Sequence, residues 1–174
     1  MKKISPILAA VAAFVAMAPA AHAADGTLNF TGNITANSCV INANAPDLVI
    51  PLGDVPASAL ASAGQRAGQT PFQIALTGCS GGSTKVAAKF ESGLADPVTG
   101  HLPLDATSSA TNVQVAVFDA TDTDNKFGQQ PAASAYQTLS GGAATLKYNA
   151  WYFATGVATV GTANANATYT LSYQ

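Results

Sequence analysis

Charged residues are scarce in this chain. They make up 9% of its 174 residues, with 7 Lys+Arg against 9 Asp+Glu and a formal net charge of −2. The basic residues form no cluster, so the sequence does not suit a nucleic-acid phosphate backbone, which clustered Lys and Arg neutralise. A surface with so few charges is unusual for a free monomer. It is easier to understand if much of the surface is covered in an assembly.

Long apolar runs are also absent after the first residues. Residues 7–17 are apolar, follow Lys2 and Lys3, and precede the small-x-small pattern Ala21-His22-Ala23. The run is shorter than the about 20 residues that span a bilayer. We therefore predict a secretion signal at 1–23. Its removal would leave five basic residues and a chain the length of one domain, exported in soluble form.

The chain has only 2 cysteines and 2 histidines. In an exported chain, Cys39 and Cys79 are expected to form one disulfide. Two free thiols or a metal-binding pair are the alternatives, but a zinc site would need further ligands. His22 lies in the predicted signal, so His101 is the one histidine left, and multi-histidine metal sites are excluded.

A catalytic site is not indicated. His101, Asp105 and Ser108 lie near one another in sequence, but no Gly-x-Ser-x-Gly turn is present, and we expect His101 to be a surface residue. Gly-rich residues 78–85 lack the Gly-Lys-Ser/Thr of a phosphate loop. We predict no catalytic residue, no cofactor and no small-molecule substrate.

Three acidic residues, Asp119, Asp122 and Asp124, resemble a calcium loop at first sight. Lys126, Phe127 and Ala133 then occupy positions where the loop needs a ligand, a glycine and the final glutamate. We expect a solvated turn and no metal. The aromatic residues at 148 and 151–153 alternate between two faces, which favours core and surface packing over a sugar-binding platform.

What the chain does contain is alternation of apolar and polar residues over short stretches, with turn residues between them. This period of two predicts antiparallel strands, and no stretch of the mature chain shows a helical period. Residues 57–70 are expected to form a loop with room for one helical turn. We predict one all-β domain, a sandwich, with strands at 38–41, 47–55, 72–79, 84–91, 112–119, 144–155 and 167–174.

The first alternating stretch, residues 26–34, has a distinct character. Leu28, Phe30, Gly32 and Ile34 fall on one face, and the residues between them are polar. Glycine weakens a strand unless something approaches it closely. We interpret the stretch as a strand made for a groove on another molecule; an ordinary first strand of its own domain is the alternative.

These features together resemble subunits of bacterial pili of the chaperone–usher pathway, especially type 1-like major pilins. The resemblance covers essentially the whole mature chain. It is carried by Gly-Thr-Leu-Asn-Phe-Thr-Gly-Asn-Ile at 26–34, by the paired cysteines, and by the tail from Tyr152-Phe-Ala-Thr-Gly through Gly161 to Tyr173-Gln174. Trp151 departs from the pattern, since a basic residue is expected there.

The resemblance implies an incomplete immunoglobulin-like β-sandwich that lacks its final strand. It divides the mature chain into an N-terminal donor-strand extension, 24–36, and a pilin domain, 37–174. The extension would donate Leu28, Phe30, Gly32 and Ile34 to the groove of the neighbouring subunit. The strand that borders the groove and is gripped by the chaperone would include Gly161, Tyr169, Leu171, Tyr173 and Gln174.

The partners implied are identical or related pilin subunits, a periplasmic chaperone and an outer-membrane usher, with the product a fimbria on the cell surface. A minor adaptor or adhesive pilin of the same system is one alternative function. A free-standing periplasmic β-sandwich binding protein is another, and it would pair its first strand within its own domain.

Overall fold

The computed structural model describes residues 28–31 and 38–174. The chain divides into two units, 1–33 and 34–174, and each is described by itself. In the described residues the second unit consists of β-strands, turns and the short 3-10 helices η1 (Asn42–Asn44), η2 (Ala57–Leu60) and η3 (Ala133–Ala135). None of these helices has the length and apolarity needed to cross a membrane.

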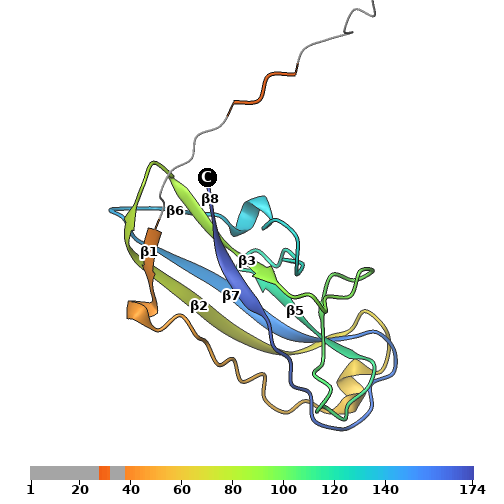
Figure 1. Ribbon diagram of the computed structural model, residues 1–174. Helices are drawn as coiled ribbons and strands as arrows, with labels where there is room; N and C mark the ends of the chain where they lie inside the picture. The colour runs from red at the N-terminus through yellow and green to blue at the C-terminus, as the bar shows by residue number, and fades with distance from the viewer. Residues whose placement is uncertain (1–27, 32–37) are drawn as a thin grey trace, which may run out of the picture. The chain divides into compact units, whose positions relative to one another are not determined.

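The larger sheet contains five antiparallel strands in the order β1-β2-β7-β5-β4. Its central strands are long because β2 and β7 pair from Arg66↔Phe153 to Leu76↔Ala144. The bounds are β1 (Ser38–Ile41), β2 (Arg66–Ser80), β7 (Ala144–Ala154), β5 (Val113–Asp119) and β4 (Leu102–Pro103). Figure 1 shows β2, β7 and β5 running side by side.

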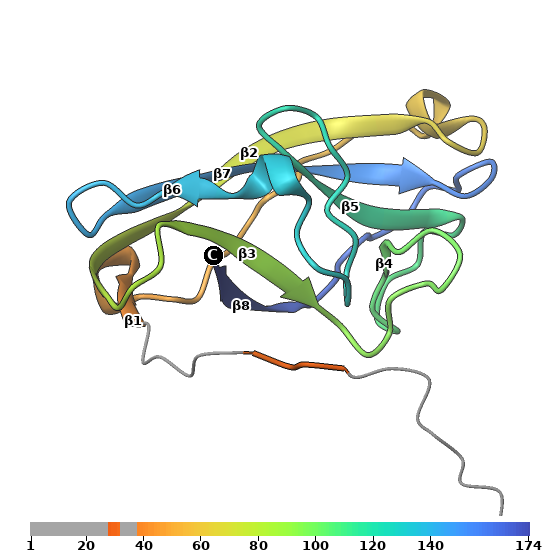
Figure 2. The ribbon, with the colours of Figure 1, turned by 90° about the horizontal axis from the view of Figure 1, so that it is seen from above.

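The smaller sheet contains three strands in the order β6-β3-β8. They are β6 (Gln137–Thr138), β3 (Lys85–Glu91) and β8 (Thr168–Tyr173), the last strand of the chain. In Figure 2 the two sheets form separate layers, with β3 and β8 below β2, β7 and β5. This arrangement confirms the prediction of a β-sandwich.

The core lies between the two layers, and β7 shows how alternation builds it. Leu146, Tyr148 and Tyr152 are buried and face the core, whereas Trp151 and Phe153 are half-buried on the outer face. Inside, the ring of Tyr148 lies 5.6 Å from that of Phe72 and 4.9 Å from that of Phe90. The predicted division of the aromatic residues between two faces is therefore confirmed.

A buried hydrogen bond ties the layers together at Tyr148. The backbone N–H of Ala88 on β3 donates to the Tyr148 hydroxyl at 2.9 Å. Burial raises the pKa of Tyr148 to about 12, so the phenol stays protonated at physiological pH.

On the outer face of the larger sheet, Arg66 packs over two aromatic rings. Its guanidinium lies 4.4 Å from the centre of the Phe118 ring and 4.9 Å from that of Trp151. The same group makes two hydrogen bonds to the carboxylate of Asp122, at 2.8 and 3.0 Å. These contacts cover the apolar surface that Trp151 and Phe118 would otherwise expose.

The predicted strands 38–41, 84–91, 112–119, 144–155 and 167–174 are confirmed to within a residue or two as β1, β3, β5, β7 and β8. The predicted start of the 72–79 strand is wrong, because β2 begins at Arg66. Its first residues include Gly68, at φ +71, where the register with β7 shifts between Ala67 and Thr70. A bulge of this kind interrupts alternation and hides the strand from a pattern search. The helical turn allowed for in 57–70 is η2.

Candidate functional site

One edge of the smaller sheet is open along β8. In residues 38–174, β8 pairs with β3 from Val86↔Tyr173 to Glu91↔Thr168 and with no other strand. Tyr169, Leu171 and Tyr173 share one face of β8 and pack against the core. The other backbone edge of the strand is therefore available to a further strand.

Residues 46–55 form the opposite wall, and here the prediction of a strand is wrong. The segment has no strand assignment, and among the described residues no backbone–backbone hydrogen bond involves Asp47 to Val55. Among the described residues, side-chain hydroxyls are the groups that hydrogen-bond to it: Thr70 donates to the Pro51 carbonyl at 3.3 Å, Tyr152 to that of Gly53 at 3.4 Å and Tyr169 to that of Pro46 at 2.7 Å. The pattern of a strand is present, but the described residues do not supply the partner needed to make it one.

Between the two walls lies an open groove with a volume of about 940 Å³. Residues 163–169, which lead into β8, line one side of it, and residues 46–54, on the chain from η1 to η2, line the other. Its floor is apolar and comes from strands of both sheets, with the side chains Phe72, Ile74, Phe90, Val115, Val117 and Tyr152. A groove with an apolar floor and unpaired backbone on both walls is suited to an extended, alternating peptide.

A smaller cavity of about 360 Å³ continues the groove beyond Tyr152. Gly161 lines it, in the loop between β7 and β8 and not on β8 itself. A Cβ at this position would lie 2.4 Å from the backbone nitrogen of Ala110 and 2.5 Å from the hydroxyl of Ser109. Only glycine permits that approach, so Gly161 lets the loop lie against residues 109–110.

Hydroxyl groups fasten this loop along its length. Ser109 exchanges hydrogen bonds with Thr162, and the hydroxyls of Thr111 and Thr159 are 3.0 Å apart. The Ser108 hydroxyl accepts from the backbone N–H of Asn164 at 2.8 Å. The end of the groove is thus held by a ladder of short polar side chains.

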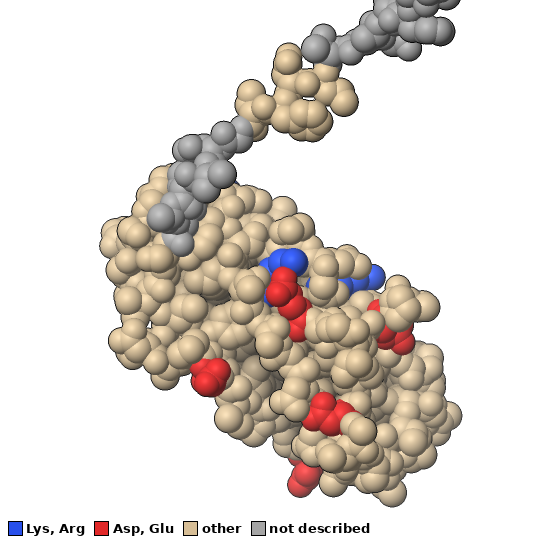
Figure 3. All heavy atoms as spheres, in the orientation of Figure 1, with Lys and Arg blue, Asp and Glu red and all other residues tan. Residues whose placement is uncertain are grey.

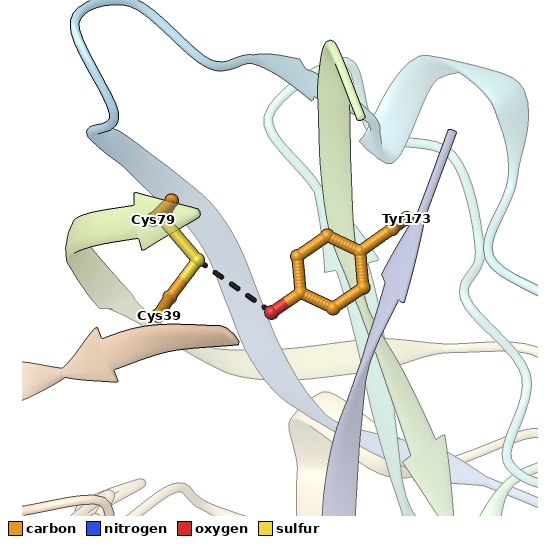
Figure 4. The surroundings of a disulfide bond; sticks show 3 residues. All are labelled: Cys39, Cys79 and Tyr173. Carbon is orange, nitrogen blue, oxygen red and sulfur yellow. Dashed lines mark hydrogen bonds between the residues drawn. A yellow bond between two sulfur atoms is a disulfide. The ribbon is translucent and has the colours of Figure 1, made fainter. Parts of the chain in front are cut away.

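The expected disulfide is present. Cys39 on β1 is bonded to Cys79 on β2, and there is no free cysteine. Figure 4 shows the ring of Tyr173 pointing from β8 towards the bond, and its hydroxyl donates to Cys39 Sγ at 3.5 Å. Burial raises the pKa of Tyr173. The C-terminal end of β8 is therefore packed against the disulfide.

The C-terminal residue extends the pairing of β8. The carbonyl of Gln174 accepts hydrogen bonds from the backbone N–H groups of Thr84 and Lys85, and the Gln174 N–H donates to the Lys85 carbonyl. Gln174 is exposed. The chain end is thereby fixed at the edge of the sheet.

In the first unit, Leu28 is 82% exposed and Phe30 is 91% exposed. Two large apolar side chains exposed to this degree have no contacts that explain their presence. Gly32 and Ile34, and all but residues 28–31 of the predicted 24–36 extension, lie outside the described residues.

The considered triad is not assembled. The His101 Nε2 lies 3.0 Å from Asp124, whereas Asp105 accepts from Asn166 and Ser108 bonds Asn164. The prediction that His101 is a surface residue is wrong: it is 3% exposed, and its ring lies 4.3 Å from that of Phe153. Loop 96–101 folds over the outer face of β5, which a sequence pattern does not reveal.

Asp119 organises the turn that had resembled a calcium loop. It is 1% exposed, so the expectation of a solvated turn does not hold for this residue. One carboxylate oxygen accepts hydrogen bonds from the backbone N–H groups of Thr121 and Thr123, and the other accepts from the Ser134 hydroxyl. In the described part of the chain, no group of His, Cys, Asp or Glu could hold a metal ion.

The fold and the groove define a class of protein: an immunoglobulin-like β-sandwich that lacks one strand between β8 and its opposite wall. Comparison with known proteins agrees with it. The family described as "Fimbrial protein" matches residues 28–174. The chain therefore belongs to the fimbrial protein family, whose members are structural subunits of the pilus at the cell surface and not enzymes.

Curated relatives extend over nearly the whole chain. The F17 fimbrial protein of Escherichia coli is 39% identical, with 100% of both chains covered. The major fimbrial subunit SMF-1 of Stenotrophomonas maltophilia is 40% identical, covering 91% of this chain and 99% of its own. The solved structure of a chaperone–usher pilus superimposes with a TM-score of 0.64 at 22% identity, covering 90% of this chain and 100% of that one. This last match concerns the fold.

Sequence reasoning missed the residues that form the floor and the far wall. Alternation identifies inward-facing side chains such as Val117 and Phe90, but it cannot tell which of them lie beneath a missing strand. It also missed the contacts of Tyr152 and Tyr169 with the wall, which join residues about 100 positions apart.

Proposed function

We propose that this subunit polymerises by donor-strand exchange. The 24–36 extension of one subunit fills the groove of the pilin domain, 37–174, of the next. The observation that carries the proposal is the groove itself, with an unpaired β8 edge facing an unpaired wall across an apolar floor. Leu28 and Phe30 are exposed apolar side chains of the kind that an apolar floor binds.

The alternating face of the donor sets both affinity and register. Leu28, Phe30 and Ile34 would each contribute about 1.5–3 kcal/mol on full burial. Each new backbone hydrogen bond adds about 0.5–1.5 kcal/mol net, before the cost of association. A slip of one residue would turn the polar row inward, so a single register is favoured. Gly32 would face the shallow part of the groove.

Head-to-tail insertion is a heterologous contact, and such contacts build open filaments when they do not close into a ring. A donor strand and an acceptor groove in one chain therefore suffice for a polymer of identical or related subunits. Dissociation must break the backbone ladder and expose the apolar row together, which makes release slow.

Before assembly, the groove must be covered during export. We propose a periplasmic chaperone whose own strand occupies the groove and an outer-membrane usher that hands the subunit on. Gln174, exposed and anchored at the end of β8, is the group that the chaperone would hold. The low charge of the visible face in Figure 3, where Lys, Arg, Asp and Glu are few and scattered, fits a subunit whose surface is largely covered in a fibre.

The test is a pair of charge substitutions on opposite faces of the donor. Phe30→Asp places a carboxylate on the apolar row, and Thr31→Asp places the same charge on the polar row. Expressed with a cognate chaperone, Phe30→Asp should be exported with its disulfide but form no fibres, as should Gly32→Leu. Thr31→Asp should polymerise.

Fibres are counted by electron microscopy and as multimers that resist hot detergent. Normal fibres from both Phe30→Asp and Gly32→Leu would contradict the assignment of the donor face.

A further inference from the structure

One hydrogen bond joins the two walls of the groove directly. The hydroxyl of Tyr169, on β8, donates to the carbonyl oxygen of Pro46 at 2.7 Å. These residues are 123 positions apart in the chain. Both line the same groove. The bond therefore crosses the space between the walls.

The wall at 46–55 is packed against the core through Leu52 and Val55, near its far end, and has few hydrogen bonds. Among the described residues it lacks a backbone ladder, and its remaining hydrogen bonds, to Pro51 and Gly53, are long at 3.3 and 3.4 Å. The Tyr169 bond is the shortest of these contacts. It holds Pro46, at the end of the wall that follows η1 in the chain.

The span of this bridge suits one missing strand. Neighbouring strands lie about 4.7–4.9 Å apart, so two walls that flank an absent strand need a separation of roughly 10 Å. An extended tyrosine side chain followed by one hydrogen bond covers a comparable distance. Because Tyr169 shares the inward face with Leu171 and Tyr173, its ring lies on the core side and leaves the backbone edge of β8 open.

We propose that Tyr169 is a positioning residue for donor-strand capture. Its hydroxyl keeps the 46–55 wall at the separation that an incoming strand requires while the groove is empty. Without the bridge, the wall samples more positions, and the donor must order it on binding, which slows capture. The proposal rests on the proposed function, since it concerns how the same groove receives its strand.

The experiment compares Tyr169→Phe with Tyr136→Phe in the mature chain. The Tyr136 hydroxyl lies 2.7 Å from the hydroxyl of Ser172, on the other face of β8, and Tyr136 does not line the groove. Each substitution removes one phenolic hydrogen bond that involves β8: Tyr169→Phe removes the bond from β8 across the groove to Pro46, and Tyr136→Phe removes the bond to Ser172 on β8. Both variants keep the ring, and thermal unfolding of each checks that the fold is retained.

Two measurements are made. The first is the association rate of a synthetic peptide of residues 26–36, labelled with a fluorophore. Tyr169→Phe should slow it roughly two- to tenfold, the range that one hydrogen bond supports, with Tyr136→Phe unchanged. The second is the backbone ¹⁵N order parameter of the non-proline residues of 47–55 without peptide, which should fall in Tyr169→Phe alone.

The outcomes separate the two proposals. If the wild-type chain does not bind the peptide, donor-strand exchange fails. Unchanged order parameters of 47–55 in Tyr169→Phe overturn the spacer role whether or not the peptide binds. An equal rate in both variants, or faster capture by Tyr169→Phe, also overturns it; faster capture would mean that the bond closes the groove.

Discussion

At the scale of single residues, the groove depends on groups that lie outside its floor. The Cys39–Cys79 bond joins β1 to β2 and receives the hydroxyl of Tyr173. Asp119 fixes the turn after β5, and the backbone of residues 109–110 leaves room for Gly161 alone. None of these groups lies on the apolar floor, yet each positions an element that borders the groove.

Loss of the disulfide should destabilise the subunit strongly. The bond closes a loop with a sequence separation of 40. On the chain-entropy model, a loop of this length contributes about 4 kcal/mol. Urea unfolding of Cys39→Ala/Cys79→Ala should therefore give a free energy of unfolding lower by about 2–5 kcal/mol. The wild type in reductant is the control, and a loss below about 1 kcal/mol would contradict the estimate.

The turn at Asp119 should make stability depend on acid. Burial alone raises the pKa of Asp119, but hydrogen bonds from Ser134, Thr121 and Thr123 outweigh it and leave the pKa below its ordinary value. A lowered pKa in the folded state adds stability above the unfolded pKa of about 3.9, and this is lost as pH falls through the folded pKa.

Asp119→Asn should therefore unfold more easily than the wild type at pH 7, by about 1–2 kcal/mol. The difference should shrink as the pH falls below about 4. Urea unfolding between pH 2 and 7 measures it, with the exposed Asp54→Asn as the control. A difference that stays constant over this range would show that ionisation of Asp119 is not involved.

At the scale of elements, alternation predicted the strands that have one buried and one exposed face, such as β7 and β8. It failed at the bulge around Gly68, where the alternation is interrupted. It also failed at β4 and β6, because strands of two residues each are too short to show a pattern. The bond between Cys39 and Cys79 could be predicted because two cysteines in an exported chain are expected to form a disulfide. The inward row of β8 could be predicted because its residues alternate. The Tyr169–Pro46 bridge could not, since it depends on how distant segments meet.

The error at 47–55 is informative. Its residues have the pattern of a strand, but no described residue pairs with their backbone. Local pattern and global fold disagree in this way where a protein keeps a site for something else. The sequence shows that an element is suited to pairing, and only the structure shows that its partner is missing.

The loop before β8 offers a test of how the far end of the groove is held. A Cβ at Gly161 would meet backbone at 2.4 Å, whereas one at Gly156 would have its nearest contact at 3.4 Å, with Asn112. Gly161→Ala should lower the free energy of unfolding by about 1–3 kcal/mol, the cost of overpacking. Gly156→Ala should change it by less than about 0.5 kcal/mol. Equal effects in urea unfolding would contradict the close approach.

At the scale of the whole molecule, a chain with an exposed apolar groove and exposed apolar side chains in its N-terminal segment is poorly suited to remain a free monomer. The chain has few charges to keep it soluble, and a net charge of only −2. Both features are explained if the subunit is stored under a chaperone and then buried in a fibre. The chain belongs to the fimbrial protein family, whose members are subunits of the pilus.

The most direct test is thermal unfolding of a chain from which 24–36 has been deleted, with and without a peptide of residues 26–36. If the sandwich is one strand short, the peptide should bind one to one and raise the melting temperature by well over 10 °C, since several kcal/mol of binding are added to a domain of this size. A truncated chain that is a stable, monodisperse monomer with no response to the peptide would contradict the account.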